Sequence, residues 1–191
     1  MPPVVIVPYR PEWPAEFHAI AAVLRRVLGP SAQRIDHIGS TSVPGLAAKD
    51  VIDVQVTVAA LTDTLVPVLE AAGFQPFERY FRDHVPPGME GVPADSWEKL
   101  FFRPANGERL ANIHVRVAGR PNQRFALLFR DFLRASPACA EAYAELKRRL
   151  ADALGDPTTY PNVKEPAVDQ IYFAAEAWAA AVGWQPGPSD A

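Results

Sequence analysis

The chain has 191 residues, of which 49% are apolar and 21% are charged, and its formal net charge is −3. This composition is typical of a soluble globular protein, and the negative charge disfavours a nucleic-acid binder that relies on overall positive charge. The single cysteine, Cys139, excludes an internal disulfide and a zinc site built from several cysteines. Because we find neither an apolar run of membrane-spanning length nor a signal-peptide pattern, we expect a cytoplasmic protein that does not enter the membrane.

The first part of the chain predicts alternating helices and strands. Helices are recognised by apolar residues on one face and by a Gly or Pro where they end, and strands by short β-branched runs. In chain order the pattern predicts an extended segment at 4–7, a helix at 11–28 and two strands at 34–38 and 51–58. A helix at 61–72 and a strand at 74–80 follow.

The second part of the chain is expected to begin with a long loop and to end in helices. We predict a loop at 81–95, followed by strands at 97–103 and 110–117 that are joined by a turn at 104–107. Three helices follow, at 121–134, 136–154 and 165–182. The last seven residues, 185–191, are expected to form a disordered tail. Together these elements predict an α/β (α+β) protein with one domain over residues 1–184. Its mixed sheet of about five strands is flanked by helices, and residues 121–184 form a helical C-terminal portion.

A small polar loop after the strand at 34–38 is the first candidate for a binding site. Gly39 has no Cβ and would let a ligand approach the backbone closely. Ser40, Thr41 and Ser42 supply hydroxyl and backbone N–H donors of the kind that hold phosphate. The loop therefore predicts a phosphate site.

A carboxylate in the following apolar strand is the second candidate. Asp53, Gln55 and Thr57 alternate along the strand and so share one face. A carboxylate in such a strand is costly unless it binds a metal or accepts good hydrogen bonds. We therefore consider Asp53 as a Mg²⁺ ligand, with Gln55 reaching metal-bound water. The alternative is a structural Asp53 that accepts hydrogen bonds from loop amides.

A third group of polar residues lies on the strand at 110–117. Asn112, His114 and Arg116 alternate with apolar residues and share a face. His114 could be a metal ligand or a general base, and Arg116 could bind a phosphate. The alternative for His114 is a hydrogen-bonded structural residue.

Further cationic residues are weaker candidates. Lys49 lies beside the polar loop and could contact a phosphate. Tyr160 could stack on a base and Lys164 could contact a phosphate, although residues of these kinds more often lie on the surface. Arg82 and His84 could belong to a lid. Four arginines on one helix face form either a solvated surface or a cationic wall facing an anion, at positions Arg120, Arg124, Arg130 and Arg134.

The order of these motifs resembles a known superfamily. A Gly39-Ser40 pair followed about a dozen residues later by Asp53 in a strand resembles nucleotidyltransferases. The fuller string over residues 37–53, which includes Pro-Gly-Leu and Ala-Lys-Asp-Val-Ile-Asp, resembles the GrpB family within that superfamily. The resemblance covers most of the chain, with further matching stretches at 7–14, 112–116, 122–134 and 160–164. The chain is also similar to the GrpB-like domain fused behind dephospho-CoA kinase in some bacteria.

This resemblance implies a nucleotidyltransferase-type fold and a possible activity. The superfamily transfers a nucleoside monophosphate from an NTP to an acceptor with Mg²⁺, which would make Asp53 the first metal carboxylate and His114 a catalytic residue. Gln55 stands where a second carboxylate is usual. That departure favours the alternative of a non-catalytic module that binds a nucleotide or a coenzyme-A-like ligand, or that assists an enzyme. In either case the expected partner is a nucleotide or another phosphorylated small molecule.

Overall fold

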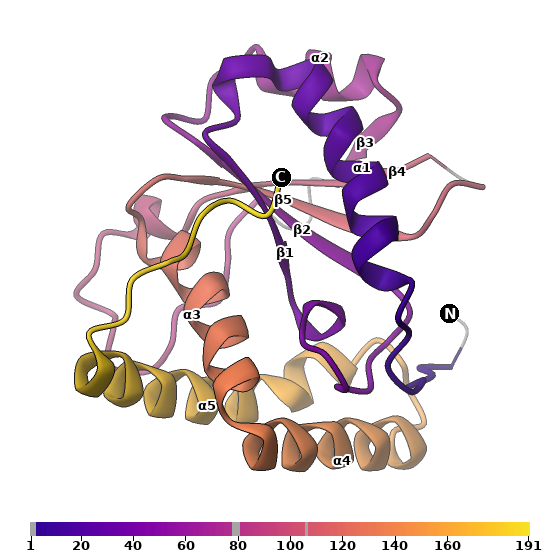
Figure 1. Cartoon of the computed structure of the whole chain (residues 1–191), viewed down its shortest axis with the longest axis vertical. Coiled ribbons are helices and arrows are strands. Elements are labelled where there is room, and N and C mark those ends of the chain that lie inside the picture. Colours follow the sequence, from indigo (N-terminus) through magenta and orange to yellow (C-terminus); the bar gives the residue numbers. More distant parts are fainter. Residues whose placement is uncertain (1–2, 78–80, 106) are drawn as a thin grey trace.

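The computed structural model describes residues 3–77, 81–105 and 107–191. It has a five-stranded mixed sheet in the order β1-β2-β5-β4-β3, in which β2 and β5 are parallel and the other neighbouring strands are antiparallel. The strands are β1 (Arg34–Ile38), β2 (Ile52–Val58), β3 (Phe74–Pro76), β4 (Leu100–Pro104) and β5 (Ala111–Val117). The α/β class and the mixed sheet predicted from the sequence are confirmed (Figure 1).

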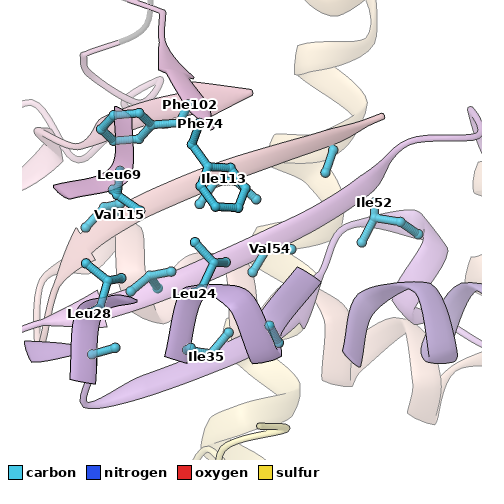
Figure 2. Close-up of a cluster of buried hydrophobic side chains, with 14 of the residues drawn as sticks. Leu24, Leu28, Ile35, Ile52, Val54, Leu69, Phe74, Phe102, Ile113 and Val115 are labelled. Atoms are coloured by element: carbon cyan, nitrogen blue, oxygen red, sulfur yellow. The ribbon is translucent and has the colours of Figure 1, made fainter. Parts of the chain in front are cut away.

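Two N-terminal helices cover one face of the sheet, as Figure 1 shows. They are α1 (Trp13–Leu28) and α2 (Leu65–Ala71). The apolar side of α1 packs Leu24 and Leu28 against Val54 and Ile113 of the central strands, and these side chains are almost fully buried (Figure 2). Burying large aliphatic side chains between a helix and a sheet is the main stabilising contribution in such a layer.

The helical C-terminal portion lies on the other side. It consists of α3 (Pro121–Ala135), α4 (Pro137–Ala153) and α5 (Tyr160–Val182). A second apolar cluster joins Phe129, Tyr143 and Tyr172 to Val43 and Leu46 of the segment that follows the polar loop. The C-terminal helices are therefore packed against the loop that the sequence marks as a candidate site.

Several boundaries differ from the predicted ones. The last helix begins at Tyr160 rather than 165, because Pro161 occupies its first turn, where a missing N–H costs nothing. Strand β3 ends at Pro76, and residues 78–80 of the predicted strand, like Asn106 of the predicted turn, lie outside the described residues. In the described ranges, no helix combines the length and the apolar character that crossing a membrane requires.

The C-terminal segment differs most from expectation. Residues 185–191 were predicted to be disordered, yet this segment runs back from α5 towards the sheet and pairs with the free edge of β1 (Figure 1). The backbone N–H of Ile35 donates to Ser189 Oγ at 2.9 Å, and that of Ala191 donates to the Ile35 carbonyl at 3.1 Å. The segment thus satisfies backbone groups that an edge strand would otherwise leave open.

Candidate functional site

A cavity of about 880 Å³ opens beside the polar loop. It is bounded by the loop, by the start of β2 and β5, by the β3–β4 region and by α4 and α5. Asp53, Ser40 and Thr41 all line it, so the structure brings the first two candidate groups together.

Gly39 is required by the position of Asp53. Gly39 has φ +69° and ψ −171°, a conformation that is open almost only to glycine. A Cβ on Gly39 would lie 2.3 Å from Asp53 Oδ2, which is an impossible contact. The glycine predicted to let a ligand approach therefore lets Asp53 itself approach the loop.

Asp53 is held by the neighbouring strand. In the β2–β5 register, Asp53, Gln55 and Thr57 lie opposite Asn112, His114 and Arg116. Asn112 Nδ2 donates to Asp53 Oδ1 at 2.8 Å. Burial raises the pKa of Asp53, while the Asn112 hydrogen bond and nearby cations oppose that rise. The predicted polar face of both strands is thus real, and Asp53 is its member closest to the polar loop.

The tautomer of His114 follows from its neighbours. Its Nδ1 lies 3.2 Å from Lys99 Nζ and 3.3 Å from Arg116 Nη2, and both of those groups can only donate. Burial, followed by Lys99 and Arg116, holds the pKa of His114 well below its ordinary value. The neutral ring therefore carries its proton on Nε2, which lies 4.0 Å from Asp53 Oδ1. This arrangement suits a hydrogen-bond donor towards Asp53 and disfavours the predicted role of base or metal ligand.

Gln55 and Arg116 are used inside the protein. Arg116 donates through Nη1 to Gln55 Oε1 at 2.7 Å and pairs through Nε and Nη2 with Asp83. Gln55 Nε2 donates to the Gln123 carbonyl, and the Gln55 side chain is fully buried. Although burial acts against it, the Arg116 ion pair holds the pKa of Asp83 well below its ordinary range. Neither predicted residue lines the cavity beside the polar loop. Gln55 is therefore not placed to bind metal-bound water there, and Arg116 is not placed to bind a phosphate there.

The donor set is therefore small for a metal ion. Among the described residues no group of three His, Cys, Asp or Glu side chains is arranged to hold one. Mg²⁺ in proteins is often bound through one or two carboxylates together with the substrate's phosphates. The residues fit a Mg²⁺ that a nucleotide carries in, with Asp53 as its protein ligand, and do not fit a metal held by the protein alone.

Lysines supply three of the five cations of the cavity, and Arg103 and Arg109 supply the other two. Only four of the 19 basic residues (Lys plus Arg) are lysines, and three of them, Lys49, Lys147 and Lys164, line it. Lys99 pairs with Asp83, whereas no ion pair within 4.0 Å joins the other three to a carboxylate in the part of the chain that the structure describes. Asp53 lines the same cavity and acts on all three lysines from a longer distance, but none of them is neutralised by direct contact with a carboxylate. Positive charge that is not paired in this way is what an anion site requires.

Aromatic rings hold these lysines. Lys49 Nζ lies 4.1 Å from the centre of the Tyr160 ring, and Lys147 Nζ lies 4.7 Å from that of Tyr143. Lys164 lies near Tyr143 as well, at 6.0 Å. Cation–π contacts of this kind position a cation without neutralising it. Lys49 and Lys164 were predicted to be near phosphate, and the structure brings both to the cavity.

Lys147 was missed by the sequence analysis. It is 3% exposed on α4, and its Nζ donates to Ser40 Oγ at 2.9 Å and to the Ala47 carbonyl. Burial, with Lys164 and Arg148 nearby, lowers the pKa of Lys147 to about 7. The signal that could have found it is the scarcity of lysine, because the chain has only four lysines among its 19 basic residues.

Other predicted residues support the loop or the packing. Ser42 Oγ donates to the Gly39 carbonyl at 2.6 Å, so it closes the loop and does not line the cavity. Thr41 lines the cavity but is 1% exposed, and its hydroxyl lies 3.0 Å from His37 Nε2. The four predicted arginines do not line the cavity, so they form no cationic wall there. Arg120 precedes α3 and the other three lie on it, and each contacts the protein: Arg120 the Asp95 carbonyl, Arg124 Glu176, Arg130 Asp190 and Arg134 the Ser42 carbonyl. Arg130 is buried, whereas the side chains of Arg124 and Arg134 remain partly exposed.

Comparisons with known proteins agree on one family. The family model described as GrpB protein matches residues 3–173. A dephospho-CoA kinase of Mycolicibacterium paratuberculosis is 42% identical over 96% of this chain, and a UPF0157 protein of Halalkalibacterium halodurans is 34% identical over 91% of this chain and 83% of its own. This chain spans about half (49%) of the length of that kinase and of the other dephospho-CoA kinases that it matches.

A solved structure has the same fold. The crystal structure of the conserved protein GrpB from Enterococcus faecalis superposes with a TM-score of 0.74 at 28% identity, over 91% of this chain and 99% of the other. The family match covers the polar loop, Asp53 and all three cavity lysines. The chain belongs to the GrpB family.

Proposed function

We propose that the chain binds a phosphorylated small molecule, a nucleotide or a coenzyme-A-like compound, in the cavity beside the polar loop. The observation that carries this proposal is the convergence of Lys49, Lys147 and Lys164 around Ser40 with no ion-paired carboxylate among the described residues. An entering phosphate would supply the missing negative charge. The similarity to dephospho-CoA kinases, which covers about half of those enzymes, supports including coenzyme-A-like ligands.

The cavity also has the size and walls of a nucleotide-sized site. Its volume of about 880 Å³ lies in the range of small-molecule pockets, roughly 300–1,000 Å³. Tyr160, Phe77 and Pro161 contribute apolar or aromatic surface next to the lysines. A ligand with a charged end and a flat or apolar end matches this lining.

A panel of thermal shifts tests the proposal and identifies the ligand class. ATP, GTP, CTP, UTP and coenzyme A are each added with and without Mg²⁺ to wild type, to Lys147→Met and to Arg149→Met. Arg149 lies on the same helix as Lys147 but has a side chain that is 78% exposed, which makes it the matched control. A ligand at 100 times its Kd should stabilise wild type and Arg149→Met by about 2.7 kcal/mol and Lys147→Met by much less. Equal stabilisation of all three proteins, or of none, would contradict the proposal.

Nucleotidyl transfer is the second candidate, and the position of Asp53 favours it. Asp53 lies on the cavity lining against Gly39, beside Ser40, with His114 Nε2 directed towards it. In this reading Asp53 would hold a Mg²⁺ that arrives with an NTP, and the ion would offset phosphate charge. The acceptor hydroxyl would attack the α-phosphorus, lose its proton to solvent and displace pyrophosphate. Ser40 and the lysines position the phosphates.

The same panel separates the two candidates when Asp53→Asn is included. Transfer predicts that an NTP stabilises the protein more with Mg²⁺ than without, and that Asp53→Asn removes the difference. Binding without transfer predicts stabilisation that neither Mg²⁺ nor Asp53→Asn alters greatly.

A further inference from the structure

A second cavity of about 370 Å³ adjoins the first. The two share Pro161 and Lys164 in their linings, so one wall at the start of α5 separates them. The second cavity is lined by the segment that contains Asp83 and Trp97 and by residues of α3 and α5. The sequence analysis gives roles to four of its lining residues, Arg82, His84, Arg116 and Lys164, but predicts no second binding cavity.

Its charged side chains are already paired. Asp83 binds Lys99 and Arg116, and His84 Nε2 lies 3.0 Å from Asp169 Oδ2. Its remaining surface is largely apolar, from Phe125, Pro161 and Val168. Apart from Lys164 at the shared wall, the cavity therefore offers little to a charged ligand group and suits a neutral one.

Two of its lining residues carry buried polar atoms without a hydrogen-bond partner in the described structure. They are Trp97 Nε1, which can only donate, and Asn122 Oδ1, which can only accept. The two residues are 1% and 2% exposed. Unpaired buried polar atoms are rare and costly in folded proteins. Neither atom is exposed as the structure stands, so the cavity wall must move for a ligand to reach them. Two such atoms of opposite kind, on residues that line one cavity, point to a molecule that supplies the missing acceptor and donor.

The orientation of the Asn122 amide is determined by its neighbours. Asn122 Nδ2 donates to Asp83 Oδ2 and to the Glu98 carbonyl, both at 3.1 Å. A flipped amide would set its oxygen against two acceptors, so the oxygen must be the unpaired atom. Tyr160, which lines the first cavity, also has a buried hydroxyl with no partner among the described residues.

We propose that the second cavity binds a neutral group of the ligand that presents one acceptor to the Trp97 indole N–H and one donor to the Asn122 carbonyl. An amide or the edge of a nucleobase has this chemistry, and the apolar walls would cover its faces. The inference rests on the phosphate site proposed above, since the shared wall would let a single ligand place its phosphate near Lys164 in the first cavity and its neutral group in the second.

The indole signals of the four tryptophans test this directly. Trp13 and Trp184 already donate to Asp50 and Asp131, so their ¹H–¹⁵N signals are internal references, and Trp97→Phe identifies the signal of Trp97. Three probes are titrated: tripolyphosphate, which is phosphate alone, ATP, which adds a base, and 4′-phosphopantetheine, which adds amides. We expect tripolyphosphate to leave the Trp97 signal in place, and ATP or 4′-phosphopantetheine to move it downfield and slow its hydrogen exchange. The probe that moves it distinguishes base from amide.

A filled cavity provides the second arm of the experiment. Val168→Phe should weaken the responding probe at least tenfold and leave tripolyphosphate binding unchanged. Val163→Phe, at a 46% exposed position of the same helix, is the control. If tripolyphosphate binds and no probe moves the Trp97 signal, the second cavity holds ordered water only and the inference is wrong while the phosphate site stands. If no probe binds at all, both proposals fail. A Trp97 shift without tripolyphosphate binding would overturn the phosphate site alone.

Discussion

At the scale of single residues, the site depends on a glycine that accommodates a carboxylate. The short distance from a Gly39 Cβ to Asp53 Oδ2 means that a larger residue must displace Asp53, the loop or both. Gly45 lies a few residues further along, has a similar positive φ of +79°, and has open space where its Cβ would be. Gly45 therefore serves as the comparison for a positive φ without a contact at Cβ.

Gly39→Ala should destabilise the protein more than Gly45→Ala does. We expect backbone strain to cost each variant about 1–3 kcal/mol, and the contact with Asp53 to cost Gly39→Ala about 1–3 kcal/mol more. Urea unfolding of both variants measures the difference. Equal losses would show that the loop adjusts freely and that Asp53 is not held against it.

Lys147 gives the second residue-scale prediction, through pH. Its pKa is about 7 in the folded protein and 10.5 for a free lysine, so above pH 7 the unfolded chain binds a proton that the folded chain does not. Stability then rises with pH between about 7 and 10.5, and the full penalty of the buried charge applies below 7. Burial also lowers the pKa values of Lys49 and Lys99, which act in the same direction.

Lys147→Met should therefore flatten this rise without abolishing it. Urea unfolding at pH 6, 7, 8 and 9 should show wild type and Arg149→Met gaining about 1–3 kcal/mol more than Lys147→Met over this range, an amount set by the size of a buried-lysine shift. Parallel curves for all three proteins would mean that Lys147 titrates normally and is not the buried amine described here.

At the scale of elements, the sequence predicts the strands better than the contacts between them. Alternation in residues 51–58 and 110–117 correctly predicted two strands with polar faces, because period two is a local property. The alternation could not show that these strands are parallel neighbours. It also could not show that the Gln55 side chain is hydrogen-bonded to Arg116 and to the Gln123 carbonyl. Those contacts join residues more than 60 positions apart, and hydrophobic pattern does not encode them.

The C-terminal segment shows a second limit of local reasoning. Residues 185–191 contain Pro, Gly and Ser, which favour disorder when considered alone. In the structure Asp190 Oδ2 lies 2.7 Å from Arg130 Nη1 and accepts from the His37 backbone N–H. A buried arginine on α3 therefore orders the segment, and only the fold reveals that partner.

Asp190→Ala should weaken this contact between α3, β1 and the C-terminal segment. Arg130 keeps Asp131 as an ion-pair partner, so we expect a loss of about 1–3 kcal/mol, in the range of hydrogen bonds to charged groups. Asp63→Ala, at an exposed position, should change stability by less than about 0.5 kcal/mol. Amide exchange of Ile35 and His37 reports the same contact, and unchanged protection of both would contradict it.

At the scale of the whole molecule, lysines are concentrated at one cavity although the chain is acidic overall. The chain has a net charge of −3, yet three of its four lysines converge from the loop, α4 and α5 on a single cavity. By contrast, the four arginines at the start of α3 and along it bind carboxylates or backbone carbonyls of the protein. This division explains how an acidic protein can present a cationic site to a small anion while discouraging long nucleic acids.

The measurement that tests this account most directly is a calorimetric titration of tripolyphosphate in EDTA at pH 6.5. Wild type and the double variant Lys147→Met/Lys164→Met are compared, with Arg149→Met as the control. The account predicts one site on wild type and on the control, and binding at least a hundredfold weaker, from two lost cations, in the double variant. No binding to wild type, or equal binding to all three proteins, would contradict the claim that these lysines form a phosphate site.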